Sequence, residues 1–202
     1  MVLAGVRKIK KFIAKRGLVL IGSLLLNILE AEYFPLASDR MWVYEVKKGF
    51  NFGDTILLVE TTYIETCRAL PANKGGLSVY LYSIKPETVY YSNTPNEILE
   101  LRSDIEKEFD TVLACTLAKL PIIVGDTWHY LLYPRSEVGL VIVVADTEET
   151  VVTPAGTFIC VRLDFYSYKE RVVRRLWLAD GVGIIKDEFP RVWLCKTLVD
   201  YK

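Results

Sequence analysis

The sequence predicts a mainly β protein, in which a curled antiparallel sheet forms a half-barrel or barrel-like meander of about nine to eleven strands. Two observations predict this fold. Short runs rich in aromatic and β-branched residues recur along residues 32–202, and Gly, Pro, Asn and Asp turn signals separate them. Half of the residues are hydrophobic, 51%, which is enough for one core. We therefore expect one antiparallel β domain over 32–202, with at most one or two short helices.

Period-two alternation predicts the individual strands. In 41–48, Trp42, Tyr44 and Val46 share one face. Further strands are expected at 54–67, 76–84, 87–93, 137–150, 156–168, 171–179, 183–189 and 192–201. In 156–168, the residues from Ile159 to Phe165 at alternate positions are expected to face the core. TPAGTF (153–158) is interpreted as a hairpin turn, because Pro154 fixes φ for the bend and Gly156 relieves it.

The segment 96–120 has two readings. Ile98, Leu101, Ile105 and Phe109 have near-helical spacing, and the preceding Thr-Pro pair would start a helix. The same segment also fits two strands, at about 97–103 and 109–119, joined by a charged turn. The surrounding β pattern favours the strands.

The N-terminal residues 1–31 differ from the rest of the chain. They hold six basic residues and one acid, and the apolar run LVLIGSLLLNIL (18–29) follows the basic part. This run is short for a membrane span, and its basic flank is typical of a signal peptide; an uncleaved membrane anchor is the alternative. Because 25 basic and 25 acidic residues occur in total, 32–202 has 19 basic and 24 acidic residues and a net charge of −5. An acidic body is a poor match for nucleic acid.

The residues expected to carry chemistry are few. His129 is the single histidine, and we interpret it as an ordinary strand residue rather than a catalytic one. No GxSxG, dinucleotide fingerprint, phosphate loop or metal-ligand spacing occurs, so no catalytic residue, metal or cofactor is expected. The four cysteines, Cys67, Cys115, Cys160 and Cys195, fit one or two disulfides or buried thiols equally well.

Two groups of residues are weak candidates for a ligand site. PLASDRMWVY (35–44) and PIIVGDTWHY (121–130) both place a Pro seven residues before a Trp-x-Tyr pair. The members of these pairs, Trp42, Tyr44, Trp128 and Tyr130, would either anchor the core or stack on a ligand, and core packing is favoured. Arg171, Arg174 and Arg175 would bind an anionic headgroup, or protect an edge strand from aggregation, which is the favoured reading.

YFPLASDRMWVYEV, LPIIVGDTWHY, TPAGTFICVRL and WLADGVGIIKDEF resemble a loose family of bacterial exported proteins and lipoproteins. That family repeats P-L-x-x-G-x-x-W-x-Y, T-P-A-G-T-F and G-V-G-x-[IV]-K patterns. The resemblance implies a fold similar to the half-barrels of lipoprotein carriers, and it carries over no catalytic residues. Two departures are the absence of a lipobox cysteine and Asp39 at the position of the first Gly, which the second copy keeps as Gly125.

These features favour a non-enzymatic bacterial envelope protein that is extracytoplasmic: periplasmic, secreted or held in the cell envelope. Its curled sheet would bind a lipid or another apolar or amphiphilic ligand, with membrane contact only through uncleaved residues 1–31. The alternative is a structural or interaction module that docks an envelope protein partner. A hydrolase acting on cell-wall or glycan substrates is the weaker alternative.

Overall fold

The computed structural model describes residues 33, 35, 40–52, 55–68, 70–74, 77–83, 88–103, 113–130 and 139–202. The chain divides into two units, Met1–Glu32 and Tyr33–Lys202, and the described residues all belong to the second. The expected signal peptide or anchor at 1–31 lies outside the described residues. Within the described ranges no residue is helical, and no helix there is long and apolar enough to cross a membrane.

The described residues form thirteen strands, which confirms a mainly β, antiparallel fold and exceeds the expected nine to eleven. The strands are β1 (Met41–Phe52), β2 (Thr55–Arg68), β3 (Leu70–Lys74), β4 (Leu77–Ser83), β5 (Thr88–Asn93), β6 (Glu97–Ser103), β7 (Leu113–Lys119), β8 (Thr127–Tyr130), β9 (Leu140–Thr153), β10 (Gly156–Tyr166), β11 (Val172–Ala179), β12 (Gly183–Phe189) and β13 (Leu194–Tyr201). β3 is not among the strands that the sequence predicts, because Pro71 lies inside this short strand and is typical of a turn.

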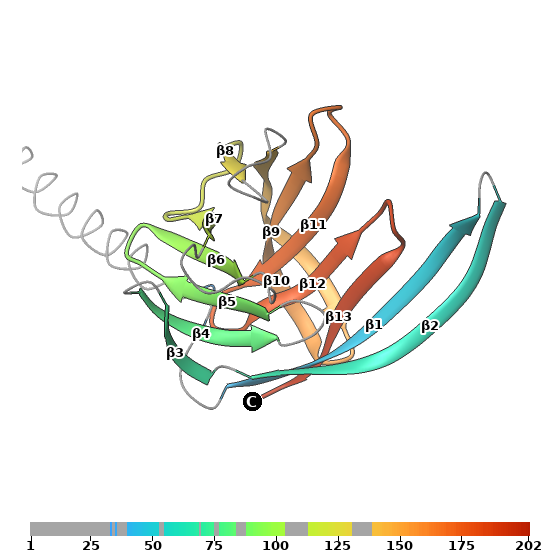
Figure 1. Cartoon of the computed structure of the whole chain (residues 1–202), viewed down its shortest axis with the longest axis horizontal. Coiled ribbons are helices and arrows are strands. Elements are labelled where there is room, and N and C mark those ends of the chain that lie inside the picture. The colour runs from blue at the N-terminus through green and yellow to red at the C-terminus, as the bar shows by residue number, and fades with distance from the viewer. Residues whose placement is uncertain are drawn as a thin grey trace, which may run out of the picture. The chain divides into compact units, whose positions relative to one another are not determined.

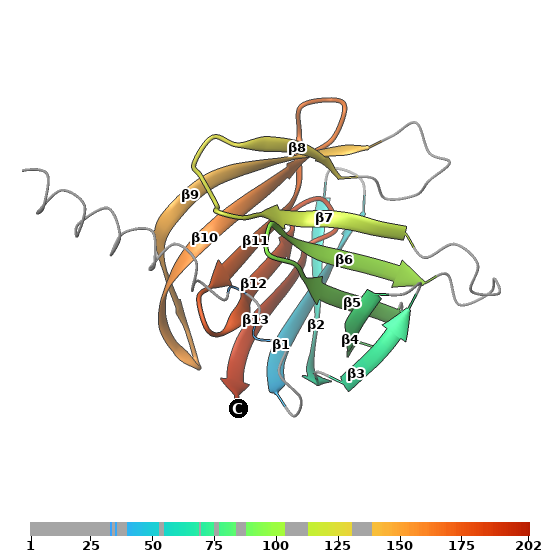
Figure 2. The ribbon, with the colours of Figure 1, turned by 90° about the vertical axis from the view of Figure 1, so that its left-hand side faces the viewer.

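The strands belong to two sheets rather than to one curled sheet. The larger has the order β2-β1-β13-β12-β11-β10-β9-β8, and the smaller has the order β3-β4-β5-β6-β7. The larger sheet curls strongly but does not close on itself among the described strands (Figure 1). The edge strand β2 of the larger sheet is followed in sequence by β3, and the other edge strand, β8, is preceded by β7. The smaller sheet is therefore an insertion between these two edge strands, and it lies across the larger sheet (Figure 2).

The segment 96–120 forms two strands, β6 and β7, in agreement with the favoured reading. Thr94 does not cap a helix. Its backbone N–H donates to the Glu97 carbonyl at 2.8 Å, and its Oγ1 accepts the Glu97 N–H at 3.1 Å, which closes the β5–β6 turn. The Thr94-Pro95 pair therefore starts a hairpin turn rather than a helix, and the Thr94 hydroxyl accepts a backbone N–H here as it would at a helix N-cap.

The TPAGTF turn joins β9 to β10 as expected, with Thr153 opposite Gly156 in register and Gly156 at a φ of 140°. Val161, Leu163 and Phe165 are buried, but Ile159 is 60% exposed, so the expected core face does not extend to it. The register shifts between Cys160 and Arg162, and this β-bulge separates Ile159 from the regular alternation of the strand.

The arginine-rich segment does not form an edge strand, which corrects the favoured reading of Arg171, Arg174 and Arg175. β11 lies between β10 and β12 in the middle of the larger sheet. Arg174 and Arg175 are consecutive strand residues, so they point to opposite faces of the sheet. Arg174 is opposite Phe165 on β10, and Arg175 is opposite Asp164.

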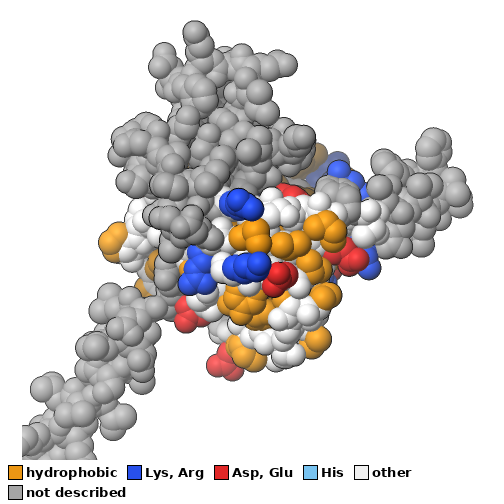
Figure 3. Space-filling view, turned by 90° about the horizontal axis from the view of Figure 1, so that it is seen from below, with side chains coloured by type: hydrophobic (Ala, Val, Ile, Leu, Met, Phe, Trp, Pro, Cys, Tyr) orange, Lys and Arg blue, Asp and Glu red, His pale blue; other side chains and the backbone are white. Residues whose placement is uncertain are grey.

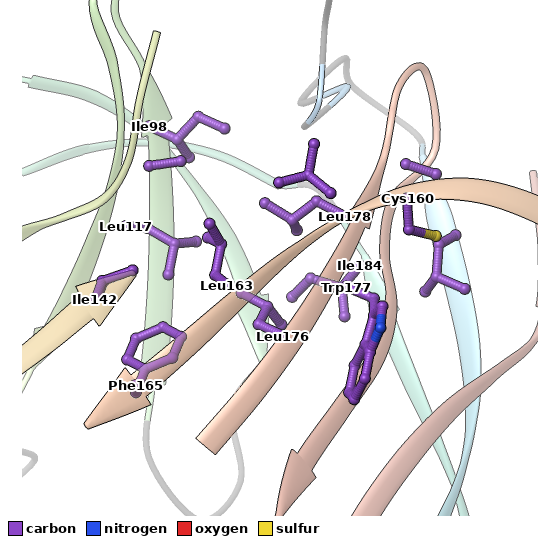
Figure 4. Close-up of a cluster of buried hydrophobic side chains, with 14 of the residues drawn as sticks. Ile98, Leu117, Ile142, Cys160, Leu163, Phe165, Leu176, Trp177, Leu178 and Ile184 are labelled. Atoms are coloured by element: carbon purple, nitrogen blue, oxygen red, sulfur yellow. The ribbon is translucent and has the colours of Figure 1, made fainter. Parts of the chain in front are cut away.

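The core fills the space between the two sheets. Ile98 and Leu117 of the smaller sheet face Leu163, Phe165 and Leu176 of the larger one (Figure 4). All five side chains are at most 1% exposed. The four cysteines are thiols and form no disulfide.

Candidate functional site

A cavity of about 470 Å³ lies at the end of the β12–β13 hairpin. Its lining residues come from β1, β11, β12, β13 and the turn between the last two: Lys47, Lys48, Gly49, Arg175, Glu188, Phe189, Pro190, Trp193, Leu194 and Cys195. A volume of this size falls in the range of small-molecule sites. The cavity combines a hydrophobic group, Phe189, Pro190, Trp193 and Leu194, with ionisable side chains. We refer to it as the hairpin pocket.

Four lining residues form one row across the larger sheet. Arg175 is opposite Glu188, Glu188 is opposite Cys195, and Cys195 is opposite Lys47 in the strand registers. Directly opposed residues in antiparallel strands share a face, so this row lies on one face of the sheet. Leu176 and Asp187, which are also opposite each other, point to the other face, toward the core. The row therefore belongs to the outer face.

The turn that follows β12 gives the pocket its aromatic wall. Trp193 has a φ of 49° and is 44% exposed. Its carbonyl accepts the Gly49 N–H at 2.8 Å, and the Val192 N–H donates to the Phe189 carbonyl at 3.1 Å. A left-handed backbone costs a bulky residue about 1–2 kcal/mol, so these hydrogen bonds hold Trp193 in a strained conformation beside the cavity.

The pocket is electrically positive, although residues 32–202 carry a net charge of −5. Its lining has three cations, Lys47, Lys48 and Arg175, and one carboxylate, Glu188. The ion pair of Arg175 with Glu188 is long, at 3.9 Å, and that of Lys47 with Glu45 spans 3.5 Å between partly exposed side chains. Exposed pairs of this kind contribute little to stability, so an anion in the pocket would compete with Glu188 for Arg175 at small cost.

The pocket borders a buried ionic cluster on the core side of the sheet. Arg174 Nε donates to Asp187 Oδ1 at 2.8 Å, and Nη2 donates to Oδ2 at 2.9 Å. Its guanidinium lies between two rings, 4.9 Å from the centroid of Phe165 and 5.4 Å from that of Phe189. Phe189 is thus shared between the cluster and the hairpin pocket.

The cluster reaches the smaller sheet through Glu100, which is 1% exposed. Glu100 accepts hydrogen bonds from Tyr130 Oη at 2.6 Å, Tyr91 Oη at 3.3 Å and Arg174 Nη1 at 3.5 Å. Burial, with the Glu100 charge, raises the pKa of Tyr91 well above its usual value, so its hydroxyl stays a donor. Burial alone would lower the pKa of Arg174, but Asp187 and Glu100 reverse this and raise it. The cluster is a cross-link between the sheets.

The two Trp-x-Tyr pairs lie in the core. Trp42, Tyr44, Trp128 and Tyr130 are at most 7% exposed. Trp42 Nε1 donates to the Val182 carbonyl at 2.6 Å, and Tyr44 Oη donates to the Ile184 carbonyl at 3.0 Å, so the first pair binds the turn Gly181–Gly183, the GVG turn, and the start of β12. Trp128 Nε1 donates to the Thr116 carbonyl at 2.9 Å. Both pairs use their polar atoms on the protein itself, as buried Trp and Tyr usually do.

The three arginines are separated by the structure. Arg171 is exposed and precedes β11, where its carbonyl accepts the Ser167 N–H at 2.9 Å. Arg174 belongs to the buried cluster, and Arg175 alone lines the hairpin pocket.

Sequence reasoning missed Trp193 and Lys47 as pocket residues. It assigned 192–201 to one strand, whereas β13 begins at Leu194 and Trp193 belongs to the turn. Pro190, which cannot extend a central strand, is the signal that would have marked this turn.

No protein-family model matches the chain, and no curated protein matches it. Among solved structures, a crystal structure of a "putative lipoprotein" from Parabacteroides distasonis ATCC 8503 matches, with a TM-score of 0.43 and 11% sequence identity. The match covers 85% of this chain and 99% of that chain. At this identity and TM-score the likeness does not identify a family.

Proposed function

We propose that the protein is a non-enzymatic binding protein, and that it takes an anionic amphiphile in the hairpin pocket. The observation that carries the proposal is the composition of this cavity, in which Phe189, Trp193 and Leu194 are combined with Lys47 and Arg175. An apolar chain would pack on the hydrophobic group, and a carboxylate or phosphate would pair with the cations.

This proposal moves the ligand from the interior of the curled sheet to the end of the β12–β13 hairpin, where residues of both faces line the cavity. Trp42 and Trp128, the weak candidates for stacking on a ligand, belong to the buried core together with Leu163 and Phe165, and all four are at most 7% exposed. Native cores are close-packed, so a ligand among these side chains would have to displace them. The hairpin pocket needs no such displacement.

A binding role without catalysis is supported by the chemistry of the lining residues. Cys195 is the one thiol among them, and its Sγ lies 3.5 Å from Thr197 Oγ1, a hydroxyl that does not act as a general base. His129 lies on β8, outside the pocket lining.

The proposed location is extracytoplasmic, and it rests on the basic and apolar residues of 1–31. Amphiphiles released from or destined for membranes are a fitting ligand class for a protein of the cell envelope.

Titration with laurate, below the concentration at which it forms micelles, tests the proposal. Trp193 fluorescence reports the pocket, because Trp42, Trp128 and Trp177 are at most 7% exposed. We expect saturable binding of laurate and weaker binding of dodecyltrimethylammonium, which has the same chain length and the opposite charge. Arg175→Gln should weaken laurate binding about tenfold, the loss of one charged hydrogen bond.

Arg171→Gln is the matched control, since Arg171 is exposed but does not line the pocket. Its laurate affinity should equal that of the wild type. The absence of saturable binding, or equal losses in the two variants, would overturn the proposal.

A second candidate function is an interaction module, and one observation favours it. Val152 and Ile159 are 75% and 60% exposed on the β9–β10 hairpin. Figure 3 shows hydrophobic side chains gathered among charged ones on the face seen from below. Crosslinking and pull-down from the envelope fraction test this role, with Val152→Asp as the variant that should lose a captured partner.

A further inference from the structure

The turn between β12 and β13 presents hydrophobic side chains to solvent. Val192 is 61% exposed and Trp193 is 44% exposed, and Pro190 beside them is exposed as well. The turn is the red loop that joins these two strands in Figure 1. The three other tryptophans are buried, so this is the place where the chain exposes an indole. We call Pro190–Trp193 the apolar tip.

Basic side chains surround the apolar tip. Arg191 is exposed within the turn itself. Lys47 and Arg175, whose side chains are 50% and 41% exposed, lie in the adjoining outer row. Glu188 is the acidic residue of the pocket lining. With Glu45, which pairs with Lys47 at 3.5 Å, these residues are three cations and two carboxylates, so the surroundings of the tip have a small positive charge, although residues 32–202 carry a net charge of −5.

The backbone of the tip holds this arrangement before any partner arrives. Trp193 keeps its φ of 49° while its carbonyl accepts the Gly49 N–H at 2.8 Å. The Val192 N–H donates to the Phe189 carbonyl at 3.1 Å. Preorganised side chains lose less conformational freedom on binding, which favours a contact made by so few residues.

We propose that the apolar tip docks on an anionic bilayer surface, with Val192 and Trp193 in the interfacial layer and the basic residues at the headgroups. Trp is enriched at membrane interfaces, and basic residues near an anionic leaflet add attraction that salt screens. A second copy of the chain fits less well, because two positive tips would repel each other. This contact is additional to any made by residues 1–31.

The inference goes beyond amphiphile binding, because it adds Arg191 and Val192, which do not line the hairpin pocket, to Pro190 and Trp193, which do. It would also place the pocket mouth at the membrane, from which an amphiphile could enter. The two proposals can therefore fail separately.

Quenching of Trp193 by brominated lipids tests the docking. The full-length chain is mixed with phosphatidylglycerol vesicles that carry brominated acyl chains, and the signal of a Trp193→Phe variant is subtracted. This readout reports the tip itself, so binding of the vesicle by residues 1–31 alone does not produce it. We expect quenching and a blue shift on phosphatidylglycerol, and at least fivefold less quenching on phosphatidylcholine or in 0.5 M salt.

Val192→Asp should reduce the quenching at least tenfold and leave laurate binding in solution unchanged. Val152→Asp, an exposed valine on another hairpin, is the matched control and should leave both unchanged. Absence of quenching on phosphatidylglycerol, or equal quenching in the two variants, overturns the proposal. If the wild-type protein did not bind laurate but its Trp193 was still quenched on phosphatidylglycerol, the proposed function would be contradicted and the docking of the tip would stand.

Discussion

Arg174 and Asp187 form a bidentate pair across two neighbouring strands, with hydrogen bonds of 2.8 Å and 2.9 Å. The pair is buried, and Arg174 also reaches Glu100 of the smaller sheet at 3.5 Å. Because the cluster joins β11 and β12 to β6, we interpret it as the contact that fixes the smaller sheet on the larger one. Three of its charges are almost out of contact with water, so the removal of any one leaves the others poorly compensated.

Arg174→Met should therefore lower the free energy of unfolding by about 3–5 kcal/mol, because Asp187 and Glu100 stay buried without their cation. Urea denaturation measures the loss. The neighbouring Arg175→Met is the matched control, since Arg175 is on the outer face with a 41% exposed side chain. Its effect should stay below about 1 kcal/mol, as is usual at exposed ion pairs. Equal effects of the two substitutions would contradict the structural role of the cluster.

Two buried thiols predict a loss of stability at alkaline pH. Burial raises the pKa of Cys67 to about 12, and also that of Cys160 to about 12, above the value of an exposed thiol. In the unfolded chain a thiol ionises near pH 8.5, so above that pH the unfolded state releases protons that the folded state keeps. Stability is therefore fully present below about pH 8.5 and falls as pH rises toward 12.

For Cys67, the free energy of unfolding should fall by up to about 1.4 kcal/mol for each pH unit above the pKa of the unfolded thiol. Urea denaturation at pH 8, 9 and 10 measures it. Cys67→Ala should be less stable at pH 8, because a buried side chain is shortened, and its stability should fall less steeply with pH. An unchanged slope would show that Cys67 ionises in the folded protein as it does in the unfolded chain.

The GVG turn predicts different costs at its two glycines. Gly181 has a φ of 68°, inside the left-handed region, whereas Gly183 has a φ of 100°, which side-chain-bearing residues rarely adopt. A Cβ at Gly183 would lie 3.5 Å from Trp42 Nε1, an ordinary contact, so the cost comes from the backbone. Gly181→Ala should cost about 1 kcal/mol, and Gly183→Ala should cost more. Thermal denaturation ranks them, and the reverse order would contradict this interpretation.

Trp193→Gly separates the roles of strain and of binding. Glycine accepts the positive φ of this position and relieves about 1–2 kcal/mol, but it adds about 0.5–1 kcal/mol of unfolded-chain entropy. The free energy of unfolding should therefore change by at most about 1.5 kcal/mol, while laurate affinity should fall at least fivefold because the aromatic wall is lost. A loss of stability above about 3 kcal/mol would instead identify Trp193 as a core residue.

The fold class and most strand positions follow from local sequence signals. Alternation places Trp42, Tyr44 and Val46 on one face, and TPAGTF forms the expected hairpin, because both patterns depend on neighbours in sequence. The exposure of Ile159 was not predictable in this way. A bulge changes the register after Cys160, and a bulge depends on the partner strand rather than on the strand itself.

The division into two sheets and the candidate site depend on contacts between distant residues. The sequence around Arg174 and Arg175 predicts only that they point to opposite faces of one strand. It does not show that Glu100 and Asp187 hold Arg174 inside the core while Arg175 lies on the outer face. The outer row from Arg175 to Lys47 joins four strands, of which β1 is more than a hundred residues away in sequence. Only the registers between strands reveal such a row.

Protection of Cys195 from alkylation tests most directly whether the hairpin pocket, and not the interior, takes the ligand. Cys195 lines the pocket, whereas Cys67 and Cys160 are buried and provide internal negative controls in a Cys115→Ser background. The measured quantity is the rate at which N-ethylmaleimide modifies Cys195, with and without saturating laurate. The account predicts at least a fivefold slower reaction with laurate and a smaller effect of dodecyltrimethylammonium at the same concentration. Saturable laurate binding that leaves the Cys195 rate unchanged would contradict it.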